Sequence, residues 1–166
     1  MENMDMIINE VTTAIEAMDP EILAGGILFL AGAFAVMVAY AVIRYLMTAI
    51  GYSKMYRKAG VEGWKAFIPF YNTYNNYKLA WAGKFFFLYA ALYVLFHAVC
   101  NSTEIAVQLA AAAAGIALIV VDAKQNIKMA KLFGKGTGTG IALMFFPGIT
   151  SLILGMGKAE YMAIAE

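Results

Sequence analysis

The chain carries no charged residue from Ile22 to Ile43. An α-helix rises about 1.5 Å per residue, so this run alone is long enough to cross the ~30 Å hydrocarbon core of a bilayer. Hydrophobic residues make up 63% of the 166-residue chain, whereas soluble domains usually contain about 45–50%. A chain this short lacks the polar surface needed to hide several apolar helices. The sequence therefore predicts a membrane protein.

Further apolar segments follow the first one. We expect membrane spans at about 22–48, 84–100, 104–122 and 139–155, the last interrupted by Pro147 and Gly148. The predicted fold is an all-α polytopic membrane protein with three to four transmembrane helices, an N-terminal amphipathic helix, and interfacial or re-entrant helices. Residues 21–166 would form a single integral membrane domain, preceded by a separate helical segment at 1–20.

An aromatic stretch, "GWKAFIPFYNTYNNYKLAW" (63–81), combines Trp and Tyr with Asn, Lys and Pro69. Trp and Tyr prefer the headgroup level of a membrane, where the ring is in apolar surroundings and its polar atom stays wet. A Lys at the centre of a span costs roughly 2.5–3.5 kcal/mol. We therefore interpret residues 61–81 as an interfacial or shallowly re-entrant segment, helical on both sides of a break near Pro69.

The charges are distributed unevenly along the chain. Residues 1–21 hold acidic residues and no Lys or Arg, while basic residues gather after the first and third spans. The positive-inside rule then places the protein in the cell membrane as a multi-pass protein, with its N-terminus extracytoplasmic. The same basic residues suit binding to anionic lipid headgroups on the cytoplasmic side. Basic residues that only fix the orientation of the spans would give the same sequence pattern. They are Lys54, Arg57, Lys58, Lys124, Lys128, Lys131 and Lys135. The net charge of +1 argues against nucleic acid as a partner.

The N-terminal segment has its own pattern. Apolar residues recur at spacings of 4, 3, 4 and 3, which predicts an amphipathic helix within 1–20 with a seam for helix pairing and an acidic opposite face. The seam consists of Met4, Ile8, Val11, Ile15 and Met18. Small residues also line the first and third spans, which favours close helix association in a membrane. We therefore expect a homo-oligomer that assembles through this seam and these small-residue faces.

The sequence offers little material for catalysis. One His, one Cys and three Ser leave no room for a catalytic triad or a thiolate metal cluster, so we expect no enzyme activity, no catalytic or metal site, and no cofactor. Four residues fall at helical spacing and could form a weak metal or proton site: His97, Cys100, Asn101 and Glu104. We favour the alternative that His97 caps the end of a span against water. Arg44 and Asp122 lie near the inner ends of their spans and are interpreted as a structural ion pair.

Two parts of the chain resemble each other. "KMYRKAG" (54–60) is similar to "KMAKLFG" (128–134), and each is followed by an apolar run that contains a proline, Pro69 or Pro147. Paired segments interrupted by Gly or Pro, in corresponding positions of two halves, are the best sequence pointer to the binding site of a transporter. Polar residues near these prolines are candidates for lining such a pathway: Asn72, Asn75, Asn76 and Thr150.

Three motifs are "YRKAGVEGWKAFIPFYNTYNNYKLA", "DAKQNIKMAKLFGKGTG" and "FFPGITSLILGMGKAEY". With them the chain resembles an uncharacterised family of small prokaryotic multi-spanning membrane proteins, over about residues 51–161. Some relatives in that family are signal-peptidase-like, whereas this chain carries no Ser/Lys peptidase portion. The resemblance implies a membrane location and leaves the mechanism open.

Two functions from different classes follow. The first is a self-assembling structural or scaffold membrane protein, without catalytic activity, that oligomerises through its N-terminal helix. The alternative is a small channel or transporter whose pathway lies between the segments broken at Pro69 and Pro147. The absence of a charged residue at the centre of any predicted span favours the scaffold hypothesis, because ion-coupled transport commonly uses such a residue.

Overall fold

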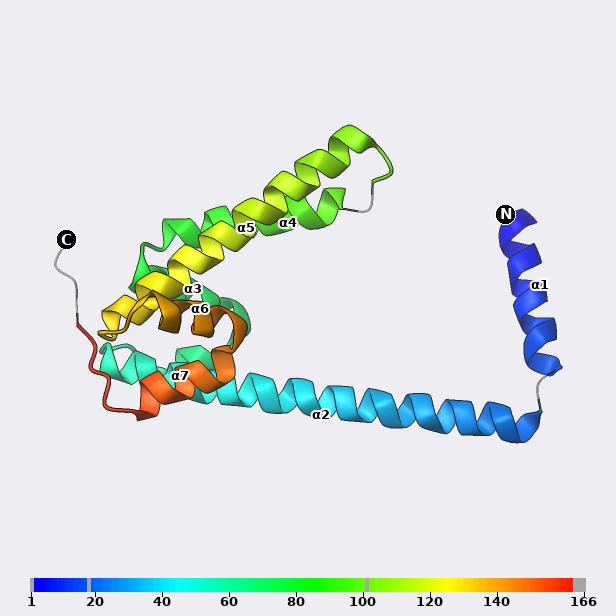
Figure 1. Ribbon diagram of the computed structural model, residues 1–166, viewed down its shortest axis with the longest axis horizontal. Helices are drawn as coiled ribbons and strands as arrows, with labels where there is room; N and C mark the ends of the chain where they lie inside the picture. Colours follow the sequence, from blue (N-terminus) through cyan, green and yellow to red (C-terminus); the bar gives the residue numbers. More distant parts are fainter. Residues whose placement is uncertain (1, 18, 101, 163–166) are drawn as a thin grey trace. The chain divides into compact units, whose positions relative to one another are not determined.

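The structure is a computed structural model that describes residues 2–17, 19–100 and 102–162. Helices account for all the regular secondary structure in these described ranges. The elements are α1 (Glu2–Glu16), α2 (Pro20–Lys58), the 3₁₀ helix η1 (Gly63–Phe67), α3 (Pro69–Ala80), α4 (Lys84–Val99), α5 (Ile105–Leu132), α6 (Thr137–Phe145) and α7 (Pro147–Met156). They form two compact units, Met1–Ile43 and Arg44–Glu166, which are considered separately below (Figure 1).

The first unit contains α1 and the N-terminal part of α2. The side-chain oxygen of Asp19 accepts a hydrogen bond from the Glu21 amide at 2.8 Å, which caps the start of α2. Met4, Ile8, Val11 and Ile15 are all exposed on α1. Met18, the last residue of the predicted seam, lies outside the described residues.

Two helices, α2 and α5, are long and apolar enough to cross a membrane by length and composition. The other apolar helices are shorter: α4 has 16 residues and α7 has 10. The all-helical prediction is therefore confirmed. Within the described part of the chain, two helices are long and apolar enough to span a membrane, compared with the three to four predicted. Both long helices also run further than expected, to Lys58 and Leu132, because no Pro interrupts the residues that follow each apolar run.

The long helices end in the same way, at the end of each repeated motif. Gly60 and Gly134 have positive φ angles of 72° and 67°. The amide of Gly60 donates to Arg57 O and the next amide to Tyr56 O; the amide of Gly134 donates to Lys131 O and the next amide to Ala130 O. This paired pattern is the Schellman cap, in which a glycine adopts the left-handed conformation without a Cβ penalty. The sequence repeat therefore corresponds to a repeated backbone structure.

Both proline-containing segments are broken, as predicted. Ile68 is extended between η1 and α3, and Phe146 leaves helical geometry between α6 and α7. Each proline occupies the start of the helix that follows, where its missing N–H costs nothing. Proline also disfavours helical geometry in the residue before it. With 12 residues, α3 is about 18 Å long, shorter than a bilayer core.

The core of the second unit gathers where the long helices meet the broken segments. A Cβ on Gly51 would overlap the Ser151 hydroxyl, and a Cβ on Gly155 would lie 2.5 Å from the Gly51 carbonyl oxygen, so α2 and α7 cross in close contact. A Cβ on Gly140 would lie 2.5 Å from Cα of Ile127, which brings α6 equally close to α5. The side chains around these crossings are buried: Tyr56, Met55, Ala66, Met129, Ala130, Phe133, Leu143 and Leu154.

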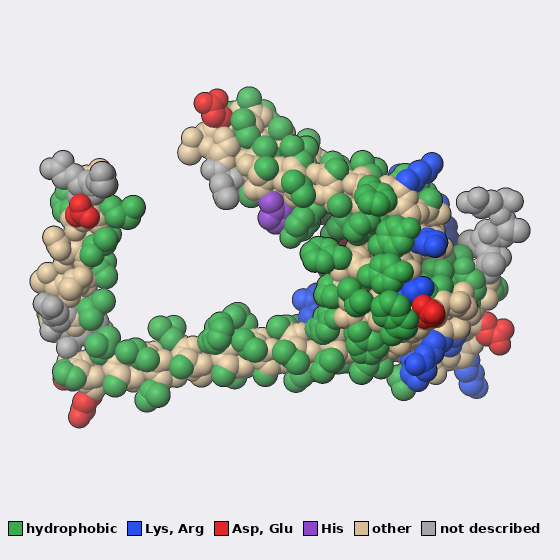
Figure 2. All heavy atoms as spheres, turned by 180° about the vertical axis from the view of Figure 1, so that it is seen from behind, with side chains coloured by type: hydrophobic (Ala, Val, Ile, Leu, Met, Phe, Trp, Pro, Cys, Tyr) green, Lys and Arg blue, Asp and Glu red, His purple; other side chains and the backbone are tan. Residues whose placement is uncertain are grey.

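The basic residues predicted to bind lipid headgroups lie in different environments. Figure 2 shows the Lys and Arg side chains over the second unit. Lys54, Arg57, Lys124, Lys131 and Lys135 are exposed. Lys58 is different, because its ammonium donates to the carbonyl oxygens of Leu154, Gly157 and Ala159 at 2.7–2.8 Å. An ammonium has three N–H donors, so these contacts use all of them, and the prediction for Lys58 is corrected to a structural role at the end of α7. Lys128 is exposed and lies 4.8 Å from the centre of the Trp81 ring.

Candidate functional site

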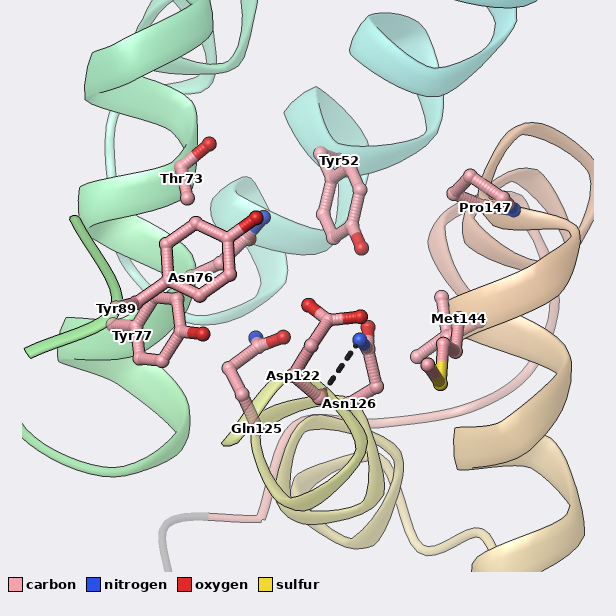
Figure 3. A pocket seen from close by; sticks show the side chains of 11 residues that line it. Tyr52, Thr73, Asn76, Tyr77, Tyr89, Asp122, Gln125, Asn126, Met144 and Pro147 are labelled. Atoms are coloured by element: carbon pink, nitrogen blue, oxygen red, sulfur yellow. Dashed lines mark hydrogen bonds between the residues drawn. The ribbon is translucent and has the colours of Figure 1, made fainter. Parts of the chain in front are cut away.

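A polar pocket lies between the broken segments of the second unit. Its volume is about 190 Å³. We call it the Asp122 pocket, after the acidic residue at its centre in Figure 3. Its lining residues are Tyr52 of α2, Thr73, Asn76 and Tyr77 of α3, Tyr89 of α4, Asp122, Gln125 and Asn126 of α5, Leu143 and Met144 of α6, and Pro147 of α7.

Helical spacing explains how two short polar sets reach this pocket. On α5, Asp122, Gln125 and Asn126 stand at positions i, i+3 and i+4. Thr73, Asn76 and Tyr77 repeat the same spacing on α3. Residues three and four apart share one face of a helix, so each set points in one direction. The break before Pro147 adds the end of α6 and the start of α7 as a third wall.

Two buried polar atoms at this pocket have no hydrogen-bond partner: the Tyr77 hydroxyl and the Gln125 amide nitrogen. The two residues are only 1% and 3% exposed. Leaving a buried polar group unpaired costs about 1–3 kcal/mol, so such groups are uncommon outside functional sites. Burial, and next the nearby Asp122 carboxylate, raise the pKa of the Tyr77 phenol, which therefore keeps its proton and can donate a hydrogen bond. Both residues therefore keep an unused hydrogen-bond donor at the wall of this pocket.

Asp122 is half-buried and its carboxylate points toward the Tyr52 side of the pocket in Figure 3. Arg44 is exposed, and among the described residues the single ion pair joins Lys65 and Glu62. The predicted pair between Arg44 and Asp122 is therefore wrong. Asp122 instead lies in the interior of α5, which continues to Leu132, and lines the pocket. Lys and Arg are both absent from the residues that line the pocket.

The repeat shows why space remains at this place. Aligning Lys54–Gly60 with Lys128–Gly134 puts Gly51 of α2 opposite Gln125 of α5. Gly51 allows α7 to approach the backbone of α2 closely. Gln125 holds a large polar side chain at the corresponding position, and its amide lies between α5 and α3 at the pocket (Figure 3). The two halves therefore share a backbone plan but differ in the side chain at this position.

The polar residues predicted to line a pathway have mostly structural contacts. Of the four, only Asn76 lines the pocket. The side-chain oxygens of Asn72 and Asn76 lie 2.5 and 2.7 Å from the Tyr56 hydroxyl and share its single proton as acceptors. Asn75 donates to the backbone carbonyl of its own helix at Tyr71, and Thr150 donates to Ala142 O at 3.1 Å. The sequence analysis did not identify Asp122, Gln125 and Asn126 of α5 as pocket residues. Their i, i+3 and i+4 spacing within "DAKQN" indicates a polar helix face.

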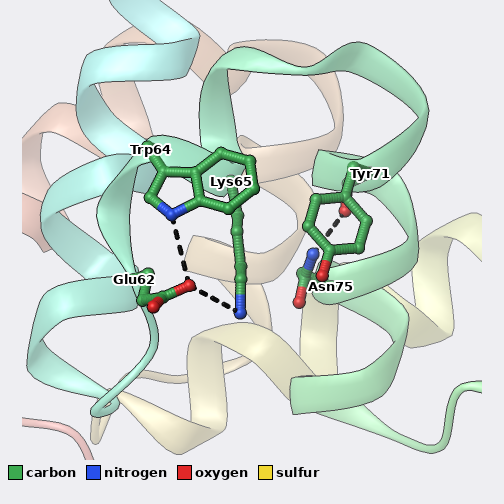
Figure 4. A network of polar contacts seen from close by, with 5 residues as sticks. All are labelled: Glu62, Trp64, Lys65, Tyr71 and Asn75. Atoms are coloured by element: carbon green, nitrogen blue, oxygen red, sulfur yellow. Dashed lines mark hydrogen bonds and ion pairs between the residues drawn. The ribbon is translucent and has the colours of Figure 1, made fainter.

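A second polar cluster lies at η1, shown in Figure 4. Glu62 accepts from the Trp64 indole at 3.2 Å and pairs with Lys65 at 3.1 Å. A hydrogen bond from Lys65 holds the pKa of the Glu62 carboxyl below its ordinary value. Glu62 and Trp64 are exposed, and exposed ion pairs contribute little to stability. This cluster shapes the turn before α3 and offers no enclosed site.

The residues once considered for a weak metal site do not assemble one. Within the described residues, no group of three or more His, Cys, Asp or Glu side chains could hold a metal ion. The His97 Nδ1 atom lies 2.9 Å from the carbonyl oxygen of Tyr93 on its own helix, and Cys100 is exposed. Asn101 lies outside the described residues.

The fold and the pocket define an all-helical protein with two helices long and apolar enough to span a membrane and a polar pocket between broken helices. The chain belongs to a family of unknown function, DUF5684, whose family model matches residues 64–163. The resemblance to an uncharacterised family is thereby confirmed for this part of the chain. The comparisons with curated proteins and with solved structures find no match.

The unpaired hydroxyl of Tyr77 gives a testable difference in stability. We expect Tyr77→Phe to raise the free energy of unfolding by about 1 kcal/mol, because it removes a buried polar group without a partner. Tyr56→Phe is the matched control and should lower the free energy of unfolding by about 1–3 kcal/mol, since it leaves the Asn76 oxygen unpaired. Unfolding in detergent, without added solutes, measures both. Equal destabilisation by the two variants would show that the Tyr77 hydroxyl has a partner after all.

Proposed function

We propose that the protein is a non-catalytic integral membrane protein that binds a small polar solute in the Asp122 pocket and acts as a small carrier or channel. One observation carries this proposal: Tyr77 and Gln125 line the same pocket as the acidic Asp122, and the buried Tyr77 hydroxyl and Gln125 amide nitrogen have no partner. A protein that used this region only for packing would gain stability by replacing these groups with apolar ones. A bound solute gives a reason to keep them.

The position of the pocket supports the same proposal. Residues of α3, which starts at Pro69, and residues on both sides of the α6–α7 break line the pocket. Binding sites of transporters are typically built from interrupted helices in two related halves. Asp122 also supplies an ionisable group inside α5, one of the two helices long enough to span a membrane. Ionisable groups close to apolar spans are uncommon and often functional, and Asp122 stands directly after the apolar run of α5.

An uptake measurement tests this function. Three classes of radiolabelled solute are tested: neutral, cationic and anionic. Liposomes containing the protein should take up at least one class several-fold faster than protein-free liposomes. Solutes of about six to nine non-hydrogen atoms suit the pocket volume, at ~30 Å³ for each displaced water. Met144→Trp should abolish the excess by filling the pocket, whereas Leu88→Trp, on an exposed position of α4, should not. Uptake no faster than in protein-free liposomes for all three classes would exclude a carrier or channel.

The proposal includes an orientation in the cell membrane. Basic residues near the ends of α2 and α5 favour a cytoplasmic location for these ends, where the exposed ones can meet anionic headgroups, and an outside location for the N-terminus. Thr103 and Lys54 are both exposed and lie on opposite sides in this orientation. In a Cys100→Ala background, an impermeant maleimide added to intact cells should label Thr103→Cys and spare Lys54→Cys. The reverse labelling pattern would invert the orientation.

Self-assembly as a scaffold remains a second proposal, and a separate observation favours it. The apolar seam of α1, from Met4 to Ile15, is exposed on the single chain. None of the most apolar stretch of α2 is buried either. Lipid can cover α2, but an apolar stripe on a helix outside the bilayer needs a protein surface. Another copy of the chain is the simplest such surface, because identical seams pair symmetrically.

A double substitution on the seam tests this second proposal. Ile8→Asp with Ile15→Asp should lower the copy number, because the charges enter the apolar contact, while membrane insertion should persist. Asn9→Asp with Thr13→Asp adds the same charge elsewhere on α1 and should leave the copy number unchanged. Mass photometry in detergent and in nanodiscs measures both. A wild type that is monomeric in both media, or an Ile8/Ile15 variant with the wild-type mass, would contradict assembly through α1.

A further inference from the structure

We infer that the Asp122 pocket takes a small organic ammonium that also carries a neutral acceptor oxygen. This inference rests on the proposed function, because it names the class of solute for the same pocket. It follows from three properties of the lining residues: their charge, the unpaired donors among them, and the volume that they enclose.

The charge of the pocket selects a cation. Among the described residues that line it, Asp122 alone carries a carboxylate, and Lys and Arg are both absent. The neighbouring Asn126 amide donates to the backbone carbonyl of Asp122 at 2.9 Å and brings no positive charge to the carboxylate. Half-buried carboxylates are stabilised by an opposite charge that also donates hydrogen bonds. An ammonium group satisfies both requirements.

The unpaired groups require an acceptor on the same ligand. Tyr77 offers a protonated hydroxyl and Gln125 offers an amide N–H, and neither atom has a partner within the protein. Both are donors, so an ammonium alone would leave them unsatisfied. A carbonyl or hydroxyl oxygen on the ligand accepts from them. A ligand carboxylate would accept too, but it would meet the Asp122 charge without any basic residue to balance it.

The volume limits the size of the ligand. A cavity of about 190 Å³ corresponds to roughly six waters at ~30 Å³ each. A molecule of about seven non-hydrogen atoms displaces this much water, and its ammonium and oxygen then stand a few bonds apart. N-(2-aminoethyl)acetamide has this size and both groups, and it is the probe for this class.

Four probes separate the parts of the inference, using the full-length protein in nanodiscs and calorimetric titration. N-(2-aminoethyl)acetamide should bind. N-propylacetamide replaces the ammonium by a methyl group, and hexylammonium lacks the acceptor oxygen; each should bind at least about tenfold more weakly, because each loses hydrogen bonds to a charged or buried group. N-acetylglycine reverses the charge and should show no binding. These comparisons use only the wild type, so they do not depend on whether a variant folds.

Two variants assign the charge effect to one residue. Asp122→Asn should weaken N-(2-aminoethyl)acetamide at least about tenfold and bring its affinity to that of N-propylacetamide. Glu160→Gln removes an exposed acid that does not line this pocket and should change neither affinity. The thermal unfolding midpoint of each variant verifies that it is folded.

The outcomes distinguish this inference from the proposed function. Equal binding of N-propylacetamide and N-(2-aminoethyl)acetamide would overturn the ammonium assignment, while binding lost in Met144→Trp would still support a solute pocket. Equal binding of hexylammonium would overturn the acceptor oxygen. Binding of N-acetylglycine, or of none of the four probes, would overturn the inference as a whole. The uptake measurement with neutral, cationic and anionic solutes then decides the proposed function on its own.

Discussion

Close contact between helix backbones at glycine residues organises the second unit. At Gly51 and Gly155, α2 and α7 approach so closely that a single added carbon would overlap the opposite helix. Gly140 allows the same contact between α6 and α5. Small residues drive helix association in membranes, where lipid is as apolar as a leucine side chain and burial alone gives little advantage. These crossings hold the short broken helices against the ends of the long ones, and the Asp122 pocket lies between them.

The pocket depends on a difference between two similar halves. Both long helices end in the same glycine cap, and both are followed by a helix break at proline. At equivalent positions, however, α2 carries Gly51 and α5 carries Gln125. The glycine lets α7 approach the α2 backbone directly, while the glutamine places a buried polar amide at the wall of the pocket. Asp122, one turn earlier on α5, adds a charge that the first half lacks, since the equivalent residue there is Thr48.

Polar groups at this pocket oppose stability and so point to function. The Tyr56 hydroxyl has Asn76 as a partner and helps to join α2 to α3. The Tyr77 hydroxyl is equally buried and has none. Two tyrosines with similar burial thus play opposite roles, and the difference lies in whether the protein itself supplies the hydrogen-bond partner. The same distinction separates Lys58, whose donors are all used by carbonyl oxygens, from the exposed basic residues beside it.

The sequence alone determined the helical class, the apolar runs, the breaks at Pro69 and Pro147, and the repeat that ends at Gly60 and Gly134. These features are local, because they follow from hydropathy, from the backbone limits of proline and glycine, and from spacing along a helix. Only the tertiary structure decided which polar residues face a pocket. Asn72, Asn75 and Thr150 find partners nearby, whereas Asp122 lines the same pocket as Tyr77 and Gln125. Such neighbours come from distant segments, and a single sequence carries no record of which helices pack together.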